Sequence, residues 1–268
     1  MNCSYIFKAN KDIGLGHFSR GLSLQRSGVS QNVKIALIHL GKLSPKEHLC
    51  LMDFSTLFGQ KFITIESLSE LQSFIQNHSM DVIFLDFPQF LDGAELRFLN
   101  IIRETSEIVT VDDLTERRLL SDLCIYPPLT WVGDLDWTNF DGRMHCGWDY
   151  QIMRPELEMI ANNNIGYKYD FLVTCGGSDP HNLSHFFVEY IIEMHADARI
   201  ALVLGPLANY KDTLNYKNLK IFNNPVDLLD IITASEVVFC TYGTILFELL
   251  FLKKTTYFIC HSHEQVRS

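Results

Sequence analysis

The sequence has little positive charge, no closely spaced pair of cysteines and no long apolar run. Its 22 Lys and Arg residues are outnumbered by 32 Asp and Glu residues, which leaves a net charge of -10 at pH 7. A nucleic-acid-binding surface usually needs a basic face, so this balance argues against a nucleic-acid partner. Any phosphate group of a ligand is then expected to be held by backbone dipoles and a few placed side chains.

Seven cysteines are scattered along the chain without a Cys-x-x-Cys pair. An odd, scattered set is typical of buried free thiols in a reducing compartment and argues against a disulfide framework or a zinc site. No apolar stretch approaches the roughly 20 residues that span a bilayer. The N-terminus also lacks a basic region followed by a long apolar one. We therefore expect a cytoplasmic protein with no membrane partner.

Short runs of β-branched and aromatic residues alternate with segments of helical length through most of the 268 residues. This alternation predicts parallel sheets covered by helices on both faces. The expected strands of the first half are 5–9, 33–40, 62–65, 82–86, 108–112 and 123–126, and the expected helices are 18–26, 45–58, 68–77 and 93–104. In the second half, strands are expected at 171–174, 200–204, 219–222, 237–240 and 256–260.

The alternation lapses between Pro127 and Arg154, where the sequence shows no clear strand or helix. A run of asparagines at 162–164 with Gly166 is typical of a surface turn shortly afterwards. We therefore predict two Rossmann-like domains, 1–152 and 153–268, with the ligand site in the crevice at their strand ends.

The first motif is Gly14-Leu15-Gly16-His17, between the first expected strand and the first expected helix. A glycine-rich turn of this kind places backbone N–H groups where an anion can bind, and it puts His17 in the first turn of the helix. The helix dipole there disfavours imidazolium, so His17 is expected to be neutral and available as a base. Arg20, one turn later, could face a phosphate or pair with an acid. A plain turn with His17 as a polar cap remains the alternative.

The second motif is Gly176-Gly177-Ser178-Asp179, at the end of the first strand of the second half. Its glycines allow close approach of a ligand to the backbone, and Ser178 or Asp179 can cap the next helix. Because Asp179 would repel a diphosphate, capping or orienting is its expected task. An ordinary strand-to-helix loop would show the same pattern.

The third motif runs from Thr241 to Glu248 and again combines strand, glycine turn and helix. Gly243 and Thr244 offer N–H and hydroxyl donors to a phosphate. Glu248, just over one helical turn later, can accept both hydroxyls of a ribose. Its apolar neighbours make a solvated surface role unfavoured, because a buried carboxylate needs a partner.

Two weaker patterns are not expected to form a functional site. Asp112-Asp113 could form a carboxylate pair, but aspartates at strand ends are more often turn formers. His261 and His263 have a spacing that a metal could use, yet no third ligand is evident near them, so we expect no metal.

Together these motifs resemble those of the UDP-sugar hydrolases of the pseudaminic acid pathway and their spore-coat polysaccharide relatives (PseG/SpsG-like), of the GT-B superfamily that includes MurG-type transferases. The resemblance extends in order over nearly the whole chain. The residues that carry it are Gly14 to His17 with Arg20, Val111 to Leu114, Tyr150 to Leu157, Gly176 to Asp179, Asn224 to Val226 with Leu228-Leu229, and Gly243-Thr244 through Glu248.

The resemblance implies a GT-B-like α/β fold, whose two Rossmann-like domains have parallel sheets facing a central cleft. It further implies hydrolysis of a UDP-linked 2,4-diacetamido-2,4,6-trideoxyhexose at the anomeric carbon, with inversion and without a cofactor, in nonulosonic acid or surface polysaccharide biosynthesis. His17 would be the general base. The implied substrate-binding residues are Gly14, Gly16, Arg20, Gly176, Gly177, Ser178, Asp179, Val226 at the uracil, Gly243, Thr244, Glu248 at the ribose, and Gln265 of the Glu264-Gln265 pair.

Two alternatives remain open. The resemblance implies that the C-terminal half binds UDP and that the N-terminal half carries the catalytic histidine; a GT-B glycosyltransferase would use the same UDP-binding half, with His17 acting on an acceptor hydroxyl. A non-catalytic nucleotide-sugar binding protein is suggested by Tyr242, where the family commonly has glycine, and by Glu264, where it has asparagine. The resemblance also implies a further helix or two after Ser268, so a truncated C-terminal domain and a degenerate relative both fit this ending. The exact sugar and the oligomeric state are not determined by the sequence.

Overall fold

The computed structural model describes residues 1–268 except 89–91, 161–165, 209–214, 226–227, 261–262 and 268. Its contacts divide the chain into two compact units. The first unit contains Met1–Lys8, His17–Ile152 and Arg267, and the second contains Ala9–Gly16 and Met153–Val266. The chain thus passes between units near Ile152, and the short loop Ala9–Gly16 groups with the second unit.

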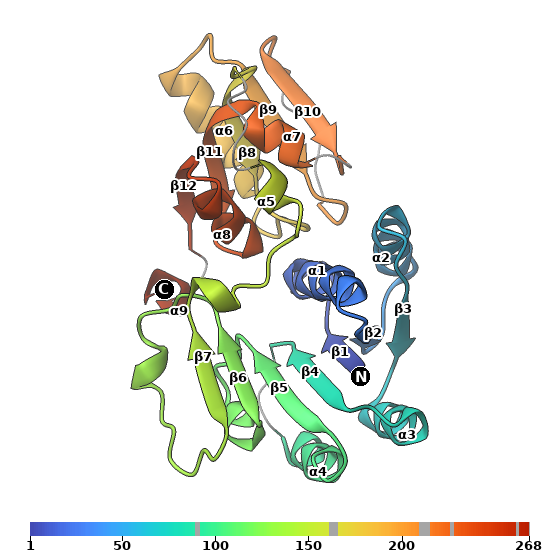
Figure 1. Ribbon diagram of the computed structural model, residues 1–268. Coiled ribbons are helices and arrows are strands. Elements are labelled where there is room, and N and C mark those ends of the chain that lie inside the picture. Colours follow the sequence, from blue (N-terminus) through green and yellow to red (C-terminus); the bar gives the residue numbers. More distant parts are fainter. Residues whose placement is uncertain (89–91, 161–165, 209–214, 226–227, 261–262, 268) are drawn as a thin grey trace. The chain divides into compact units, whose positions relative to one another are not determined.

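The first unit is built on a seven-stranded sheet, counted over the described residues, in which every neighbouring pair is parallel. The strand order is β3-β2-β1-β4-β5-β6-β7 (Figure 1). The strands are β1 (Asn2–Phe7), β2 (Lys34–Leu40), β3 (Phe62–Ile65), β4 (Val82–Asp86), β5 (Glu107–Val111), β6 (Leu123–Tyr126) and β7 (Arg143–Cys146). Because β1 pairs directly with β4, Phe7 lies in register with Asp86 at the carboxyl ends of both strands.

Helices connect these strands, and their starts follow from local capping chemistry. Ser44 and Glu47 form a capping box at α2, which begins at Pro45, and Asp92 accepts hydrogen bonds from the first turn of α4. Such caps satisfy N–H groups that have no partner within the helix. The connecting elements are α1 (Gly16–Ser30), α2 (Pro45–Leu57), α3 (Leu68–His78), α4 (Gly93–Ile102) and the 3-10 helices η1 (Glu116–Leu120), η2 (Val132–Asp134) and η3 (Trp148–Tyr150).

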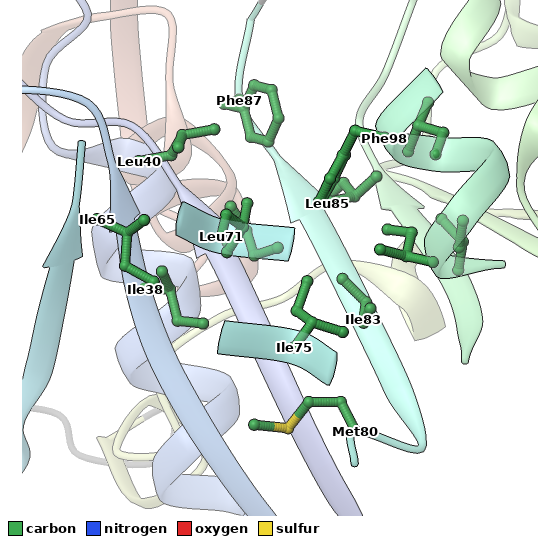
Figure 2. Close-up of a cluster of buried hydrophobic side chains, with 14 residues drawn as sticks. Ile38, Leu40, Ile65, Leu71, Ile75, Met80, Ile83, Leu85, Phe87 and Phe98 are labelled. Atoms are coloured by element: carbon green, nitrogen blue, oxygen red, sulfur yellow. The ribbon is translucent and has the colours of Figure 1, made fainter. Parts of the chain in front are cut away.

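A core of aliphatic side chains lies between the sheet and the helices α3 and α4. Figure 2 shows Leu71 and Ile75 of α3 among the side chains of Ile38, Ile65 and Ile83 from the strands. These five residues are at most 8% exposed. Their burial is the main stabilising contribution on this face, since fully burying one such side chain contributes about 1.5–3 kcal/mol.

The second unit has a five-stranded parallel sheet, again counted over the described residues, in the order β10-β9-β8-β11-β12. Alternate residues of its strands enter two cores: Leu172 and Val238 pack with α7 and α8, whereas Val173 and Phe239 pack with α6. Helices therefore cover both faces. The elements are α5 (Leu157–Ile160), β8 (Tyr169–Thr174), α6 (Leu183–Met194), β9 (Ile200–Leu204), β10 (Leu219–Asn223), α7 (Leu228–Thr233), β11 (Ser235–Thr241), α8 (Thr244–Phe251), β12 (Thr255–Ile259) and α9 (His263–Arg267).

The expected strands and helices all occur, with ends shifted by a few residues, but the expectation of no strand between Pro127 and Arg154 is wrong. Strand β7 lies there, at the edge of the first sheet beside β6. Its residues are exposed or half-buried and include Arg143 and His145. An edge strand pairs on one side only and needs no continuous apolar run, so its pattern was not recognised. Among the described helices, none has the length and apolarity needed to cross a bilayer.

Candidate functional site

His17 lies in the first turn of α1, as expected from the glycine turn that precedes it. Gly14 has a φ of 83°, in the left-handed region that glycine tolerates, and its N–H donates to the carbonyl of Asn10 at 2.8 Å. The Asn10 side chain accepts N–H bonds from Asp12 and Ile13 within the same turn. This compact turn ends where α1 begins, which sets the position of the histidine on the helix.

The histidine ring contacts a carboxylate that the sequence analysis did not single out. Asp86 is the last residue of β4 and is fully buried, and its Oδ1 lies 2.7 Å from His17 Nδ1. The His17 side chain itself is 21% exposed. The pair therefore has one buried, fixed partner and one partner that reaches the surface of the first unit.

Arg20 and Tyr5 complete the surroundings of this carboxylate. Arg20 Nε donates to Oδ2 at 2.8 Å and Nη2 donates to Oδ1 at 2.6 Å, a two-point contact with Asp86. The buried Tyr5 hydroxyl donates to Oδ2 as well. With His17, four donors converge on two oxygens, which matches the roughly four acceptor sites of an ionised carboxylate. Asp86 is thus suited to hold other groups in place, because its own acceptor sites are occupied.

The protonation states follow from these contacts. Burial alone would raise the pKa of Asp86, but the nearby Arg20 guanidinium and His17 outweigh it and hold the pKa well below the ordinary aspartate value. Burial likewise opposes the charge of Arg20, yet Asp86 and Asp112 keep the Arg20 pKa above its ordinary value. Asp86 is therefore an acceptor only, and His17 Nδ1 must carry the hydrogen that it donates.

In the neutral form of the ring, this arrangement places the hydrogen on Nδ1 and leaves Nε2 as the acceptor nitrogen. Arg20 Nη2 also lies 2.9 Å from Nδ1. Since both groups donate to the same Asp86 oxygen, that approach is between two donors that share an acceptor. Among the described residues no hydrogen bond occupies Nε2. The geometry is that of a histidine oriented by a carboxylate and able to take a proton at Nε2.

The Asp112-Asp113 dipeptide does not form a carboxylate pair. Asp112 has a φ of 54° and lies 3.2 Å from Arg20 Nη1, with its side chain 31% exposed. Burial raises the pKa of Asp112, Arg20 opposes that rise, and Asp86 adds to it. Asp113 points instead to the buried Arg117, which also contacts Glu95 at 2.6 Å. Asp112 thus contacts Arg20 beside His17, whereas Asp113 forms an ion pair with Arg117 in the core.

The loop after β8 is shaped by close backbone packing. Gly176 has a φ of 75°, and Leu207 donates its N–H to the Gly177 carbonyl at 2.9 Å. A Cβ added to Gly205 would lie 2.3 Å from the Gly176 carbonyl oxygen, so only glycine fits there. Asp179 accepts from the N–H groups of residues 183 and 184 at the start of α6, at 2.8 and 3.0 Å. Asp179 thus has the expected capping role, and Ser178 beside it is buried.

The loop after β11 leaves the start of α8 without a side-chain cap. Gly243 is the N-cap residue and has no side chain to cap the helix, and apart from its chain neighbours no described residue lies within 4 Å of where its Cβ would be. The first N–H groups of α8 and the half-buried Thr244 thus offer donors of the kind that bind an anion. Glu248 follows on the same helix and is 4% exposed.

Glu248 is paired with an arginine from a distant part of the same unit. Arg154 Nε donates to Glu248 Oε1 at 2.9 Å, across 94 residues of sequence. Burial raises the pKa of Glu248, and Arg154 opposes that rise. The other oxygen, Oε2, is buried and has no hydrogen-bond partner among the described residues. The expectation of a buried glutamate with a partner is confirmed, and Arg154 is a residue whose role the sequence did not reveal.

The remaining expected residues are assigned to one or the other unit or lie outside the described residues. His17 and Arg20 belong to the first unit, whereas Gly14 and Gly16 group with the second. Gln265 lies on α9, half-buried. Val226 and His261 lie outside the described residues. In the part of the chain that is described, no three His, Cys, Asp or Glu side chains gather to hold a metal ion.

Asp86 could have been anticipated. The run Val82–Asp86 is apolar until its last residue, and an acid at the carboxyl end of a buried parallel strand lies at the edge where ligands bind. What the run does not reveal is that its neighbour in the sheet is β1, which precedes His17.

Comparison with known proteins places this geometry in context. No family model matches the chain. It is 23% identical over 266 residues to the UDP-2,4-diacetamido-2,4,6-trideoxy-beta-L-altropyranose hydrolase of Campylobacter jejuni, covering 96% of this chain and 90% of that protein. An uncharacterized protein of Methanocaldococcus jannaschii is 29% identical over 119 residues, which cover 40% of this chain and a quarter (25%) of that relative.

Solved structures agree in fold. The glycotransferase of kitacinnamycin superposes with a TM-score of 0.63 at 12% identity, covering 99% of this chain and 82% of that one. The UDP-GlcNAc 2-epimerase of M. jannaschii, in complex with UDP-GlcNAc and UDP, has a TM-score of 0.55 at 13% identity, and the match covers 98% of this chain and 85% of that one. The chain has the GT-B type of fold, with two parallel-sheet α/β units. At these identities the likeness establishes the fold alone.

Proposed function

We propose that this protein is an enzyme that hydrolyses a UDP-linked 2,4-diacetamido-2,4,6-trideoxyhexose at its anomeric carbon and releases UDP with inversion. The observation that carries the proposal is the contact of His17 Nδ1 with the buried, ionised Asp86, while Nε2 has no hydrogen bond within the described part of the chain. The likeness to the Campylobacter jejuni hydrolase over nearly the whole chain supports the choice of substrate class.

In the proposed reaction, a water oxygen forms a bond to the anomeric carbon while the bond from that carbon to the UDP oxygen breaks. The water proton moves to His17 Nε2, and the leaving UDP keeps the bonding electron pair. Asp86 stabilises the imidazolium that forms, because its charge lies 2.7 Å from Nδ1. A positioned base of this kind typically contributes about 100- to 10,000-fold to the rate.

The second unit supplies donors for the nucleotide. The N–H groups at the start of α8, with the Thr244 hydroxyl, would stabilise the charge that develops on the diphosphate. Gly176, beside which no described side chain lies within 4 Å of an added Cβ, would allow the close approach of a phosphate to the backbone, whereas Gly177 packs against Leu15. Glu248 Oε2, which lacks a partner, would accept a ribose hydroxyl. Glu248→Ala should then weaken UDP binding by more than about 1 kcal/mol, and unchanged affinity in calorimetry would reject this role.

The direct test follows UDP release by NMR, with the UDP-sugar alone and with candidate acceptors. His17→Ala should lower water-dependent release by at least about 100-fold. His78→Ala is the matched control, since His78 is exposed on α3 of the same unit and should leave the rate unchanged. Equal rates for wild type and His17→Ala would reject the histidine as base.

A glycosyltransferase is the second candidate, and the fold likeness to the kitacinnamycin glycotransferase favours it. Release of UDP only when an acceptor is present would support transfer over hydrolysis. An epimerised UDP-sugar in the same spectra would point to the chemistry named for the M. jannaschii structure. Tight UDP binding without any turnover would indicate a nucleotide-sugar binding protein.

A further inference from the structure

The buried carboxylate of Glu248 has an unequal pair of oxygens. Oε1 accepts the Nε–H of Arg154 at 2.9 Å, whereas Oε2 has no partner within the described part of the chain. Glu248 is 4% exposed and lies on α8, next to Phe247 and Leu249, which are also buried. A buried acceptor without a donor is costly, so such an atom is expected where a ligand supplies the donor.

Arg154 is placed to control this carboxylate. It precedes α5 in the segment that opens the second unit, and its contact with Glu248 brings that segment against α8. The Arg154 side chain is 23% exposed, so its charge remains partly hydrated, whereas the carboxylate is almost fully buried. Without the guanidinium, burial would favour the neutral acid, which has one fewer strong acceptor site. The arginine therefore favours the charged form of the glutamate and holds its Oε1 in place.

We propose that Arg154 is a positioning residue for recognition of the ribose of a ribonucleoside diphosphate. By holding Oε1, it favours the ionised form of Glu248 and leaves Oε2 to accept a ribose hydroxyl. The inference rests on the proposed function, because it takes UDP as the nucleotide. It assigns to Arg154 a task that a merely structural ion pair would not have, namely discrimination between ribose and a sugar that lacks these hydroxyls.

The test compares UDP with 2′,3′-dideoxyuridine 5′-diphosphate by titration calorimetry on the full chain. Wild type should bind UDP at least about tenfold more tightly than the dideoxy compound, the scale of one hydrogen bond to a charged group. Arg154→Met should reduce the ratio of the affinities for UDP and the dideoxy compound to about twofold or less. The variant should bind UDP more weakly, while its affinity for the dideoxy compound changes little. Glu248→Gln should have the same effect, and the double variant should lose nothing further, because both residues act through one bond.

Arg199→Met is the matched control within the same unit. Arg199 pairs with Asp170 at 2.5 Å on the surface, with side chains 53% and 32% exposed. Its replacement should leave the ratio of the affinities for UDP and the dideoxy compound unchanged. If Arg154→Met weakens both nucleotides equally, or keeps the wild-type ratio, the positioning role is overturned although UDP binding stands. If wild type binds neither nucleotide, the proposed function is rejected, and the positioning role is rejected with it. If Arg154→Met does not fold, Arg154→Lys, which keeps the charge but not the Nε–H donor to Oε1, decides the question: an unchanged ratio would overturn the positioning role.

Discussion

Replacing Asp86 with asparagine should destabilise the first unit strongly. Asp86 is fully buried and receives donors from His17, Arg20 and Tyr5. Asparagine keeps the shape but removes the charge and replaces one acceptor oxygen with a donor. The Arg20 side chain is 10% exposed, so its guanidinium would remain buried with Asp112, at 3.2 Å, as its remaining carboxylate contact.

The magnitude follows from the difference between buried and exposed ion pairs. Removing one partner of a buried pair costs about 3–5 kcal/mol, because the other charge stays buried without compensation. Asp112→Asn is the matched control, since Asp112 contacts the same Arg20 with a side chain that is 31% exposed. The loss of such a partly solvated contact should cost about 1 kcal/mol or less. The two variants therefore differ mainly in the burial of the carboxylate that they remove.

The assay is urea unfolding followed by tryptophan fluorescence. All three tryptophans, Trp131, Trp137 and Trp148, lie in the first unit, so the signal reports on this unit. The variant should show a midpoint shifted to lower urea, with a loss of about 3–5 kcal/mol in the free energy of unfolding. A loss within about 1 kcal/mol of that for Asp112→Asn would refute the reasoning.

The pH dependence gives a second check on the same carboxylate. Its contacts lower the pKa of Asp86 in the folded state, so its contribution is fully present above the unfolded value of about 3.9. That contribution to stability is lost as the pH falls from the pKa of Asp86 in the unfolded state toward its lower pKa in the folded state. The stability difference between wild type and Asp86→Asn should therefore narrow below about pH 4. A difference that does not narrow would contradict an ionised Asp86.

Two further predictions concern neighbours of these sites. Tyr5→Phe removes a buried hydroxyl that donates to Asp86 and should cost about 1.5–3 kcal/mol in the same fluorescence titration, less than Asp86→Asn; unchanged stability would contradict the contact. Gly205→Ala places a Cβ 2.3 Å from the Gly176 carbonyl oxygen and should lower stability by about 1–3 kcal/mol and weaken UDP binding. Gly133→Ala, where no atom lies within 4 Å, is its control, and equal melting temperatures by circular dichroism would disprove the close approach.

Much of the fold and part of the site could be predicted from local patterns. Period-two and helical spacing depend on neighbouring residues, so the strands and helices were found with ends shifted by a few positions. The turn before His17 and the cap at Asp179 are likewise short-range features. Strand β7 was missed because an edge strand is only partly buried and carries polar residues such as Arg143.

The sequence by itself determined the alternation of strands and helices, the glycine turns at their junctions and the need of Glu248 for a partner. Only the tertiary structure decided which partners meet. Asp86 reaches His17 across 69 residues because β4 pairs with β1, and Arg154 reaches Glu248 across 94. Periodicity is local, whereas the strand order of a parallel sheet brings together carboxyl ends that are far apart in the chain. The orientation of His17 by Asp86 is a product of that order.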